Sequence, residues 1–182
     1  MTWVNGLHVK NRSSTGEAEE ALIRYCSPVL LGCKPACLFN MHDRSLLLCL
    51  LPSYIASLVI REHNGRALLL VFNTALLEET VLNNPIRSAL IEMGYPIRYS
   101  LPSFLAHLKA RFGSGQFPHE VGLFLGYPLD DVRDFIKYKG YNYKLCGVWK
   151  VYNDVKKAKQ CFRQYDLCRE CMRTLLKRVI HI

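Results

Sequence analysis

The sequence predicts a single α+β or α/β domain in which helices cover a small sheet of about three strands. Segments with the three-to-four-residue apolar period of helices alternate with short apolar runs typical of buried strands. The 182 residues lie within the usual size of one domain, half of them are apolar and 21% are charged. No internal repeat or low-complexity linker divides the chain. We therefore expect one domain over residues 1–182, with residues 1–14 as a candidate flexible segment.

The first third of the chain is expected to contain two helices and a strand. Residues 15–26 place acidic side chains in a first helical turn, where they suit the positive end of the helix dipole, and Pro28 is expected to end this helix. An irregular segment with two prolines then leads into a short strand over residues 36–40. A second helix, kinked or broken at Pro52, is expected over residues 44–62.

The middle of the chain is expected to add a strand and two helical regions. Residues 64–73 begin with Asn-Gly, a turn signal, and continue as a short apolar run that fits a buried strand. Helices should cover residues 74–93 and 101–112. Pro85 marks a new helical start in the first of these regions, because proline is tolerated in a first turn and disfavoured inside a helix.

Start and stop signals divide the region from residue 117 to residue 153. The run "FPHEVGLFLGYP" predicts a short helix with Pro118 at its first position and Gly126 as its C-terminal cap. Residues 128–140 predict another capped helix, with proline and acids at the front and glycine at the end. Residues 143–153 are rich in aromatic and β-branched side chains and predict a strand.

Positive charge gathers at the C-terminal end. Residues 130–182 contain 13 Lys and Arg against 6 Asp and Glu, so they supply +7 of the total charge of +9. Residues 154–182 predict a long helix, because apolar side chains recur every three or four positions: Val155, Ala158, Phe162, Tyr165, Cys168, Met172, Leu175 and Val179. Another face carries Lys156, Lys159, Arg163, Arg173 and Lys177. This basic face is a candidate nucleic-acid surface, but Asp166 and Glu170 interrupt it, which favours an ordinary solvated face.

The sequence predicts a cytoplasmic protein without a membrane span. The N-terminus lacks the basic start and continuous apolar stretch of a secretory signal. The most apolar segment, residues 45–60, contains Pro52 and is shorter than the roughly 20 residues that cross a bilayer.

The eight cysteines are expected to be reduced, because disulfide frameworks belong mostly to small secreted domains. Cys33 with Cys37, and Cys168 with Cys171, have spacings that could each supply half of a four-thiolate zinc or iron–sulfur site. The second pair lies inside a predicted helix, where free cysteine behaves as a small buried hydrophobe. We therefore assign no metal site, and no cofactor is identified.

His119 and Glu120 are the candidate catalytic residues. They would lie in the first turn of the helix that begins at Pro118, where a neutral imidazole beside a carboxylate could act as acid or base. Adjacent helical residues point about 100° apart, however, and Leu123 stands where a zinc-binding "HExxH" run needs a second histidine. Capping and buried hydrogen bonds are the preferred interpretation.

Four other residues are candidates for ligand binding: Tyr127, Trp149, Lys150 and Lys34. Trp149 could stack on a planar ring and Lys150, flanked by aromatic residues, could hold an anion. Lys34 could also stabilise an anion. The alternative for Lys150 is an ordinary side chain at a sheet edge.

Several runs of residues together resemble the bacterial domain of unknown function family 3793. The runs are "YCSPVLLGCKPACLF" (25–39), "PHE" (118–120), "LGYPLDDV" (125–132), "GVWKVY" (147–152) and "FRQYDLC" (162–168). The resemblance implies a stand-alone bacterial cytoplasmic protein and no established activity. Four of the eight cysteines, Cys49, Cys146, Cys161 and Cys171, fall outside these family runs, which weighs against a four-thiolate metal site.

Three functions remain open at this level. The favoured one is a non-catalytic module that binds an unknown small molecule or protein, with His119, Glu120, Tyr127, Trp149 and Lys150 around one concave surface. The second is an enzyme that uses His119 and Glu120 as an acid–base pair, with Lys34 or Lys150 holding an anion. The third is an adaptor that binds protein or nucleic acid through the basic C-terminal helix.

Overall fold

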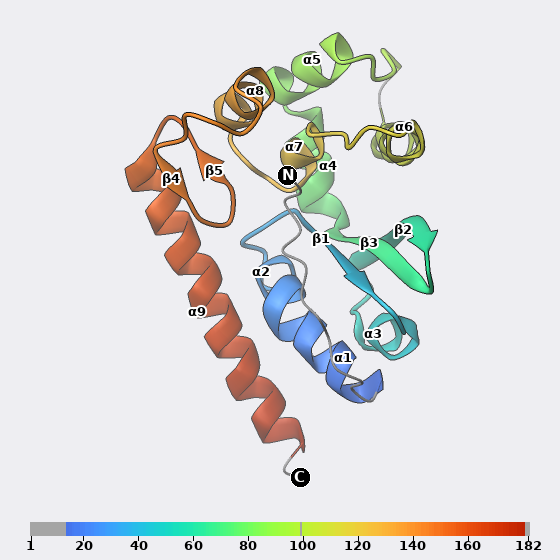
Figure 1. Cartoon of the computed structure of the whole chain (residues 1–182). Helices are drawn as coiled ribbons and strands as arrows, with labels where there is room; N and C mark the ends of the chain where they lie inside the picture. The colour runs from blue at the N-terminus through green and yellow to red at the C-terminus, as the bar shows by residue number, and fades with distance from the viewer. Residues whose placement is uncertain (1–13, 99, 181–182) are drawn as a thin grey trace.

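The computed structural model describes residues 14–98 and 100–180 (Figure 1). The candidate flexible segment at residues 1–14 lies outside the described residues, except for Ser14, where the first helix begins. The fold is α+β. An antiparallel sheet lies among helices, as the sequence predicted, and a second, two-stranded sheet is much smaller.

The main sheet consists of β1 (Ala36–Met41), β2 (Ile55–His63) and β3 (Arg66–Asn73) in the order β1-β3-β2. The predicted strands at residues 36–40 and 64–73 are confirmed as β1 and β3. Asn64 and Gly65 both have positive φ, 49° and 70°, and form the expected turn between β2 and β3. The central strand is apolar from Ala67 to Phe72 because both of its faces are covered there: alternate residues enter two different core clusters.

One face of the sheet is covered by the N-terminal helices α1 (Ser14–Ala21), η1 (Leu22–Cys26), α2 (Ser27–Leu30) and α3 (Ser45–Leu50). The prediction that Pro28 ends the first helix is wrong. Pro28 lies in the first turn of α2, directly after the π-helical turn η1. A proline is tolerated there, because the wider π turn disturbs the usual hydrogen-bond ladder before it.

The prediction of a helix over residues 44–62 is correct only in its first part. The helix α3 ends at Leu50, and Leu51 is extended. After Pro52 the chain forms β2, which pairs with β3 along its whole length. A short apolar run does not show whether its residues follow a helical or a strand period. The structure of residues 55–63 was therefore decided by their pairing with the central strand β3.

The other face of the sheet is covered by α4 (Thr74–Leu82), α5 (Asn84–Glu92), α6 (Leu101–Gly113) and α7 (Val121–Phe124). Pro85 lies in the first turn of α5, as predicted. Ser100 and Ser103 form a reciprocal capping box at the start of α6.

The predicted strand over residues 143–153 is a hairpin. After α8 (Leu129–Lys137), the chain forms β4 (Leu145–Cys146) and β5 (Lys150–Val151), which are antiparallel. Gly147 interrupts the strand. A Cβ atom at this position would lie 2.2 Å from the ring of Phe162, so the hairpin can pack this closely on that ring because residue 147 is glycine.

The predicted C-terminal helix is confirmed as α9 (Val155–Ile180). It begins beside the hairpin and passes along α2 and η1 (Figure 1). Its Ala158, Tyr165, Cys168 and Met172 are buried, whereas Leu175, which the pattern placed on the same face, is exposed. Within residues 14–98 and 100–180, no helix combines the length and the apolar composition that a membrane crossing requires.

Candidate ligand pocket

A cavity of about 880 Å³ lies between the N-terminal helices, β1, α7 and α9. Its walls combine aromatic and cationic side chains, which include Arg24, Tyr25, Lys34, Phe39, Phe117, Tyr127, Tyr165, Arg169 and Arg173. These residues come from segments far apart in the sequence. Helix α9 brings the last three of them, more than 100 positions from Lys34, to one wall.

Lys34 lies on the loop between α2 and β1, and the backbone of this loop holds it in the cavity wall. The N–H groups of Cys33 and Lys34 both donate to the carbonyl of Pro28, at 2.8 and 3.0 Å. Gly32, with φ of 70°, allows the reversal. The lysine side chain is thereby buried and only 8% of Lys34 is exposed.

Among the described residues, the ammonium of Lys34 has aromatic rings as neighbours and no acidic partner. Its Nζ lies 5.3 Å from the ring centre of Tyr127 and 5.8 Å from that of Tyr165. Cation–π contacts of this kind stabilise an ammonium only partly. Burial, with the nearby charge of Arg169 as a smaller cause, lowers the pKa of Lys34 from 10.5 to about 8.

Three arginines add positive charge to the cavity. Arg24 forms an ion pair with Glu20 at 3.6 Å, and Glu20 also lines the cavity. Arg169 pairs with Asp166 and donates to the carbonyl of Arg24 at 3.2 Å. The exposed Arg173 lies one helical turn further along α9 and also faces the cavity.

Two pairs of neighbouring thiols lie around the pocket. Cys37 lies 4.0 Å from Cys26, sulfur to sulfur, and this contact together with burial raises the pKa of Cys26. Burial, together with the neighbouring thiol of Cys33, raises the pKa of Cys168 to about 11. These shifts keep the thiols of Cys26 and Cys168 protonated and uncharged at neutral pH. Among the described residues, no three His, Cys, Asp or Glu side chains are grouped as metal ligands.

Trp149 supports the pocket from behind. It is 3% exposed, and its ring stacks on Tyr127 at 5.0 Å and meets the edge of Phe162 at 4.6 Å. Its indole N–H donates to Asp131 at 2.8 Å. Its ring contacts and its donor are therefore engaged within the fold, and its stacking places the Tyr127 ring against Lys34.

Asp131 is a buried carboxylate that the sequence reasoning missed. Besides the indole of Trp149, it accepts hydrogen bonds from the backbone of Tyr152 and from the backbone and side chain of Asn153, at 2.9 to 3.1 Å. With four donors its charge is compensated, so it fastens the hairpin to α8. Its position in the first turn of a capped helix gave no sign of this burial.

Lys150 lies apart from the cavity lining. Its ammonium donates to the carbonyl of Gly140 at 2.7 Å and lies 4.6 Å from the ring centre of Tyr143. It therefore stabilises the loop between α8 and β4. Of the four ligand-binding candidates, the structure brings Lys34 and Tyr127 to the cavity wall, Trp149 behind it, and Lys150 elsewhere.

His119 and Glu120 precede α7 and are not in its first turn as predicted; Glu120 is the N-cap residue. Glu120 is 4% exposed and accepts from Arg111 at 2.9 Å. The imidazole of His119 lies between Phe117 and Phe135, and burial lowers its pKa. Neither candidate acid–base residue is part of the cavity lining, although Phe117 and Val121 on either side of them are.

The sequence from residue 22 to residue 182 matches the family described as "Protein of unknown function (DUF3793)". This chain belongs to the DUF3793 family. The resemblance identified from the sequence runs is thereby confirmed. No curated protein and no solved structure matches the chain.

The DUF3793 match contains nearly all of the pocket. It begins at Leu22 and therefore includes Lys34, both tyrosines that face it and the two arginines of α9. Of the lining residues that the structure describes, only Gly16, Glu19 and Glu20 lie before it. The pocket is thus built mainly from the part of the chain that defines its family membership.

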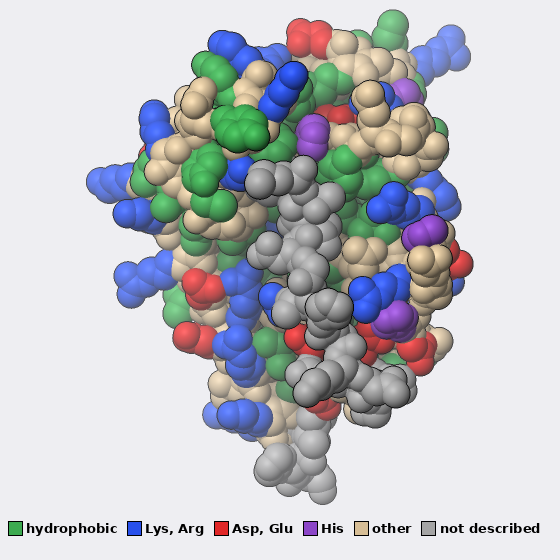
Figure 2. Space-filling view, in the orientation of Figure 1, with side chains coloured by type: hydrophobic (Ala, Val, Ile, Leu, Met, Phe, Trp, Pro, Cys, Tyr) green, Lys and Arg blue, Asp and Glu red, His purple; other side chains and the backbone are tan. Residues whose placement is uncertain are grey.

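The basic side chains of α9 are exposed, as the amphipathic pattern predicted: Lys156, Lys159, Arg163, Arg173 and Lys177. Figure 2 shows Lys and Arg side chains spread along the edge of the molecule where α9 runs. Asp166 and Glu170 are exposed on the same helix. The positive surface of this DUF3793 chain is therefore interrupted.

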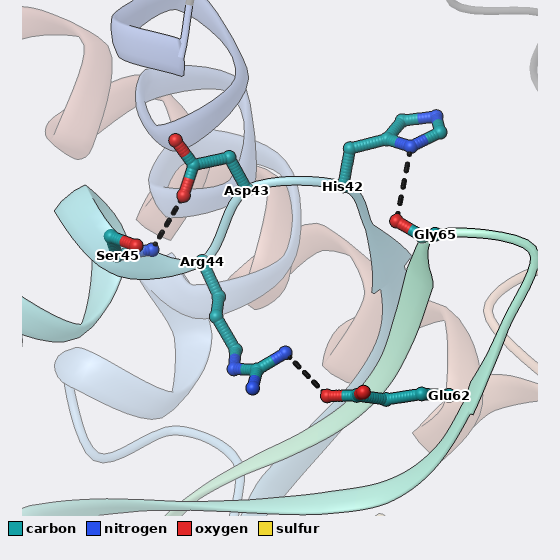
Figure 3. Close-up of polar contacts among 6 residues, drawn as sticks. All are labelled: His42, Asp43, Arg44, Ser45, Glu62 and Gly65. Atoms are coloured by element: carbon teal, nitrogen blue, oxygen red, sulfur yellow. Dashed lines mark hydrogen bonds and ion pairs between the residues drawn. The ribbon is translucent and has the colours of Figure 1, made fainter.

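A smaller cavity of about 260 Å³ lies at the far end of the main sheet, beside the turn between β2 and β3. Figure 3 shows its polar contacts: Arg44 pairs with Glu62 at 2.7 Å, and the Nδ1 atom of His42 lies 3.3 Å from the carbonyl oxygen of Gly65. Asp43 accepts from the backbone of Ser45 at 2.9 Å. The charges drawn here have partners, so these contacts fasten the end of β1 to the turn.

Proposed function

We propose that the protein is a non-catalytic binding module that holds a small organic anion in the cavity around Lys34. One observation carries this proposal: the Lys34 ammonium is buried in the cavity wall and makes no hydrogen bond or ion pair with a described residue. Even after relaxation, burying an ion in a protein costs several kcal/mol. A buried, uncompensated charge beside a cavity is a mark of a functional site.

The charge and shape of the cavity favour an anion with an apolar or aromatic body. Its volume of about 880 Å³ lies within the range of small-molecule pockets. The rings of Tyr25, Tyr127 and Tyr165 offer surfaces to a planar group, while Lys34 and Arg173 offer charge. A carboxylate or phosphate placed near Lys34 would supply the missing counter-charge.

Binding is favoured over acid–base catalysis because His119 and Glu120 lie outside the cavity lining and Glu120 is paired with Arg111. We also place the protein in the bacterial cytoplasm, in line with the expectation from its sequence and family resemblance. There, reduced thiols such as Cys37 would persist in the cavity wall.

Ligand-observed NMR with charged and uncharged probe pairs tests the proposal. Phenyllactate and phenyl phosphate should bind, and methyl phenyllactate and phenol should bind at least about tenfold more weakly, because they lack the charge that pairs with Lys34. Lys34→Met should abolish the preference for the charged probes. Lys159→Met, which removes an exposed lysine of α9, should leave it unchanged.

A second readout is proton uptake on binding. An anion beside Lys34 favours the charged ammonium, so its pKa should rise from about 8 toward the ordinary value of 10.5. At a pH between these values, calorimetry in buffers of different ionisation enthalpy should report uptake of a proton in the wild type and none in Lys34→Met. Equal binding of charged and uncharged probes, or identical results with both variants, would reject the proposal.

A further inference from the structure

Lys34 differs in one respect from the arginines around the cavity, because it can lose its proton. A guanidinium stays protonated at any physiological pH, whereas a buried lysine is readily deprotonated. A desolvated lysine amine next to another cation is the arrangement that makes lysine a nucleophile. In this pocket the desolvation comes from Tyr127 and Tyr165, and the neighbouring cation is Arg169.

No described carboxylate holds Lys34 in its charged form. The groups whose charges act on it are Cys37, Arg169 and Cys161. The two tyrosines are themselves kept neutral, because burial raises the pKa of Tyr127 and of Tyr165. The amine therefore faces the cavity without an anionic partner that would block it.

We propose that Lys34 forms a reversible imine with a ligand that carries a carbonyl group next to its carboxylate, a 2-oxo acid. This inference rests on the proposed function and narrows the ligand class of the same cavity. The carboxylate would meet the positive charge of Arg169 and Arg173, and the carbonyl carbon would face the amine. An aromatic or apolar substituent of the acid would lie against the tyrosine rings.

The chemistry needs no reagent beyond the ligand. The lone pair of the neutral Nζ forms a bond to the carbonyl carbon, and the electron pair of the C=O π bond moves to oxygen, which takes up a proton. The resulting carbinolamine loses its hydroxyl group as water while nitrogen loses a proton and forms the C=N bond. One amine and one carbonyl thus give one imine and one water, and hydrolysis restores both.

Borohydride trapping tests the inference directly. Glyoxylate, pyruvate and phenylpyruvate are each incubated with the full chain and cyanoborohydride, and the modified peptides are identified by mass spectrometry. Trapping should occur at Lys34 at least about tenfold faster than at the exposed Lys159, because a larger share of the buried amine is unprotonated. The rate at Lys34 should saturate with probe concentration, whereas the rate at Lys159 should rise linearly.

One variant and one competitor make the outcome decisive. Lys34→Arg keeps the positive charge but cannot form an imine, so it should show no trapping at position 34. Phenyllactate, which has a hydroxyl in place of the carbonyl, should compete with trapping in the wild type. Unselective trapping of surface lysines by all three probes, with phenyllactate still bound, would overturn the imine and leave the anion site intact. If the wild type also fails to bind phenyllactate, the anion site itself is overturned.

Discussion

Replacing Lys34 with methionine should make the folded protein more stable. Methionine is a linear apolar side chain of similar length, so it fills the same space without a charge. The pKa of Lys34 falls from 10.5 to about 8 on folding, and each unit is equivalent to about 1.4 kcal/mol. Below pH 8 the buried charge therefore lowers the free energy of unfolding by about 3 kcal/mol, which Lys34→Met should recover in large part.

The effect should depend on pH in a defined direction. Between pH 8 and 10.5 the unfolded chain carries a proton on Lys34 that the folded chain lacks, so the stability of the wild type rises with pH in this window. Above it, both states are neutral and the penalty is absent. The advantage of Lys34→Met should therefore be largest below pH 8 and disappear as the pH approaches 10.5.

Urea denaturation followed by circular dichroism at several pH values measures both points. Lys159→Met is the matched control, because it removes an exposed positive charge of α9 and should change stability by less than about 1 kcal/mol at every pH. If Lys34→Met is neutral or destabilising at pH 7, the ammonium has compensation that the structure does not explain, and the argument for a functional lysine fails.

Three further predictions concern the structure around the pocket. Asp131→Ala should lower the free energy of unfolding by about 3–5 kcal/mol, because buried donors lose their acceptor. Asp130→Ala, at the exposed neighbouring position, should change it by less than about 1 kcal/mol. Equal losses in urea denaturation would contradict the role assigned to Asp131. Gly126→Ala should destabilise by about 1–3 kcal/mol more than Gly32→Ala in thermal melting. Both glycines have positive φ, but a Cβ at Gly126 would lie 2.6 Å from a proline ring and one at Gly32 would meet nothing, so similar losses would refute the steric argument. Burial lowers the pKa of His119, so its imidazole should titrate below pH 6.5 when followed by NMR. The free energy of unfolding should fall as the pH is lowered below 6.5, because the unfolded chain then binds a proton more readily than the folded chain. A titration midpoint at or above pH 6.5 would show that the imidazole is not desolvated.

Local signals predicted most elements of this fold. Pro85, Asn64-Gly65 and the amphipathic pattern of α9 each act within a few residues, and the structure agrees with all three. The two misassigned segments depended on distant partners. Residues 55–63 are a strand because β3 offers them hydrogen bonds. Residues 143–153 form a hairpin whose turn packs closely on the distant Phe162 ring, where only Gly147 leaves room for it.

The candidate site was harder to predict from the sequence, because it too depends on contacts between residues that are far apart in the chain. Lys34 and Tyr127 could be selected as candidates from their neighbours in the chain. Their contact with Tyr165 depends on how α9 packs against α2, which no local pattern encodes. Asp131 was missed because an acid in the first turn of a helix already has a sufficient explanation in the helix dipole.

Lys34 and Asp131 together show why burial alone does not identify a functional charge. Both belong to the few buried charged residues of the described chain, and both lie close to the Tyr127–Trp149 stack. Asp131 receives four hydrogen bonds that fasten two elements together, so its charge is accounted for by the fold. Within the described part of the chain, Lys34 contacts the faces of two aromatic rings and no hydrogen-bond or ion-pair partner, so these residues leave its charge uncompensated. A buried charge that lowers stability and holds no elements together is the observation on which the proposal of a ligand in this cavity rests.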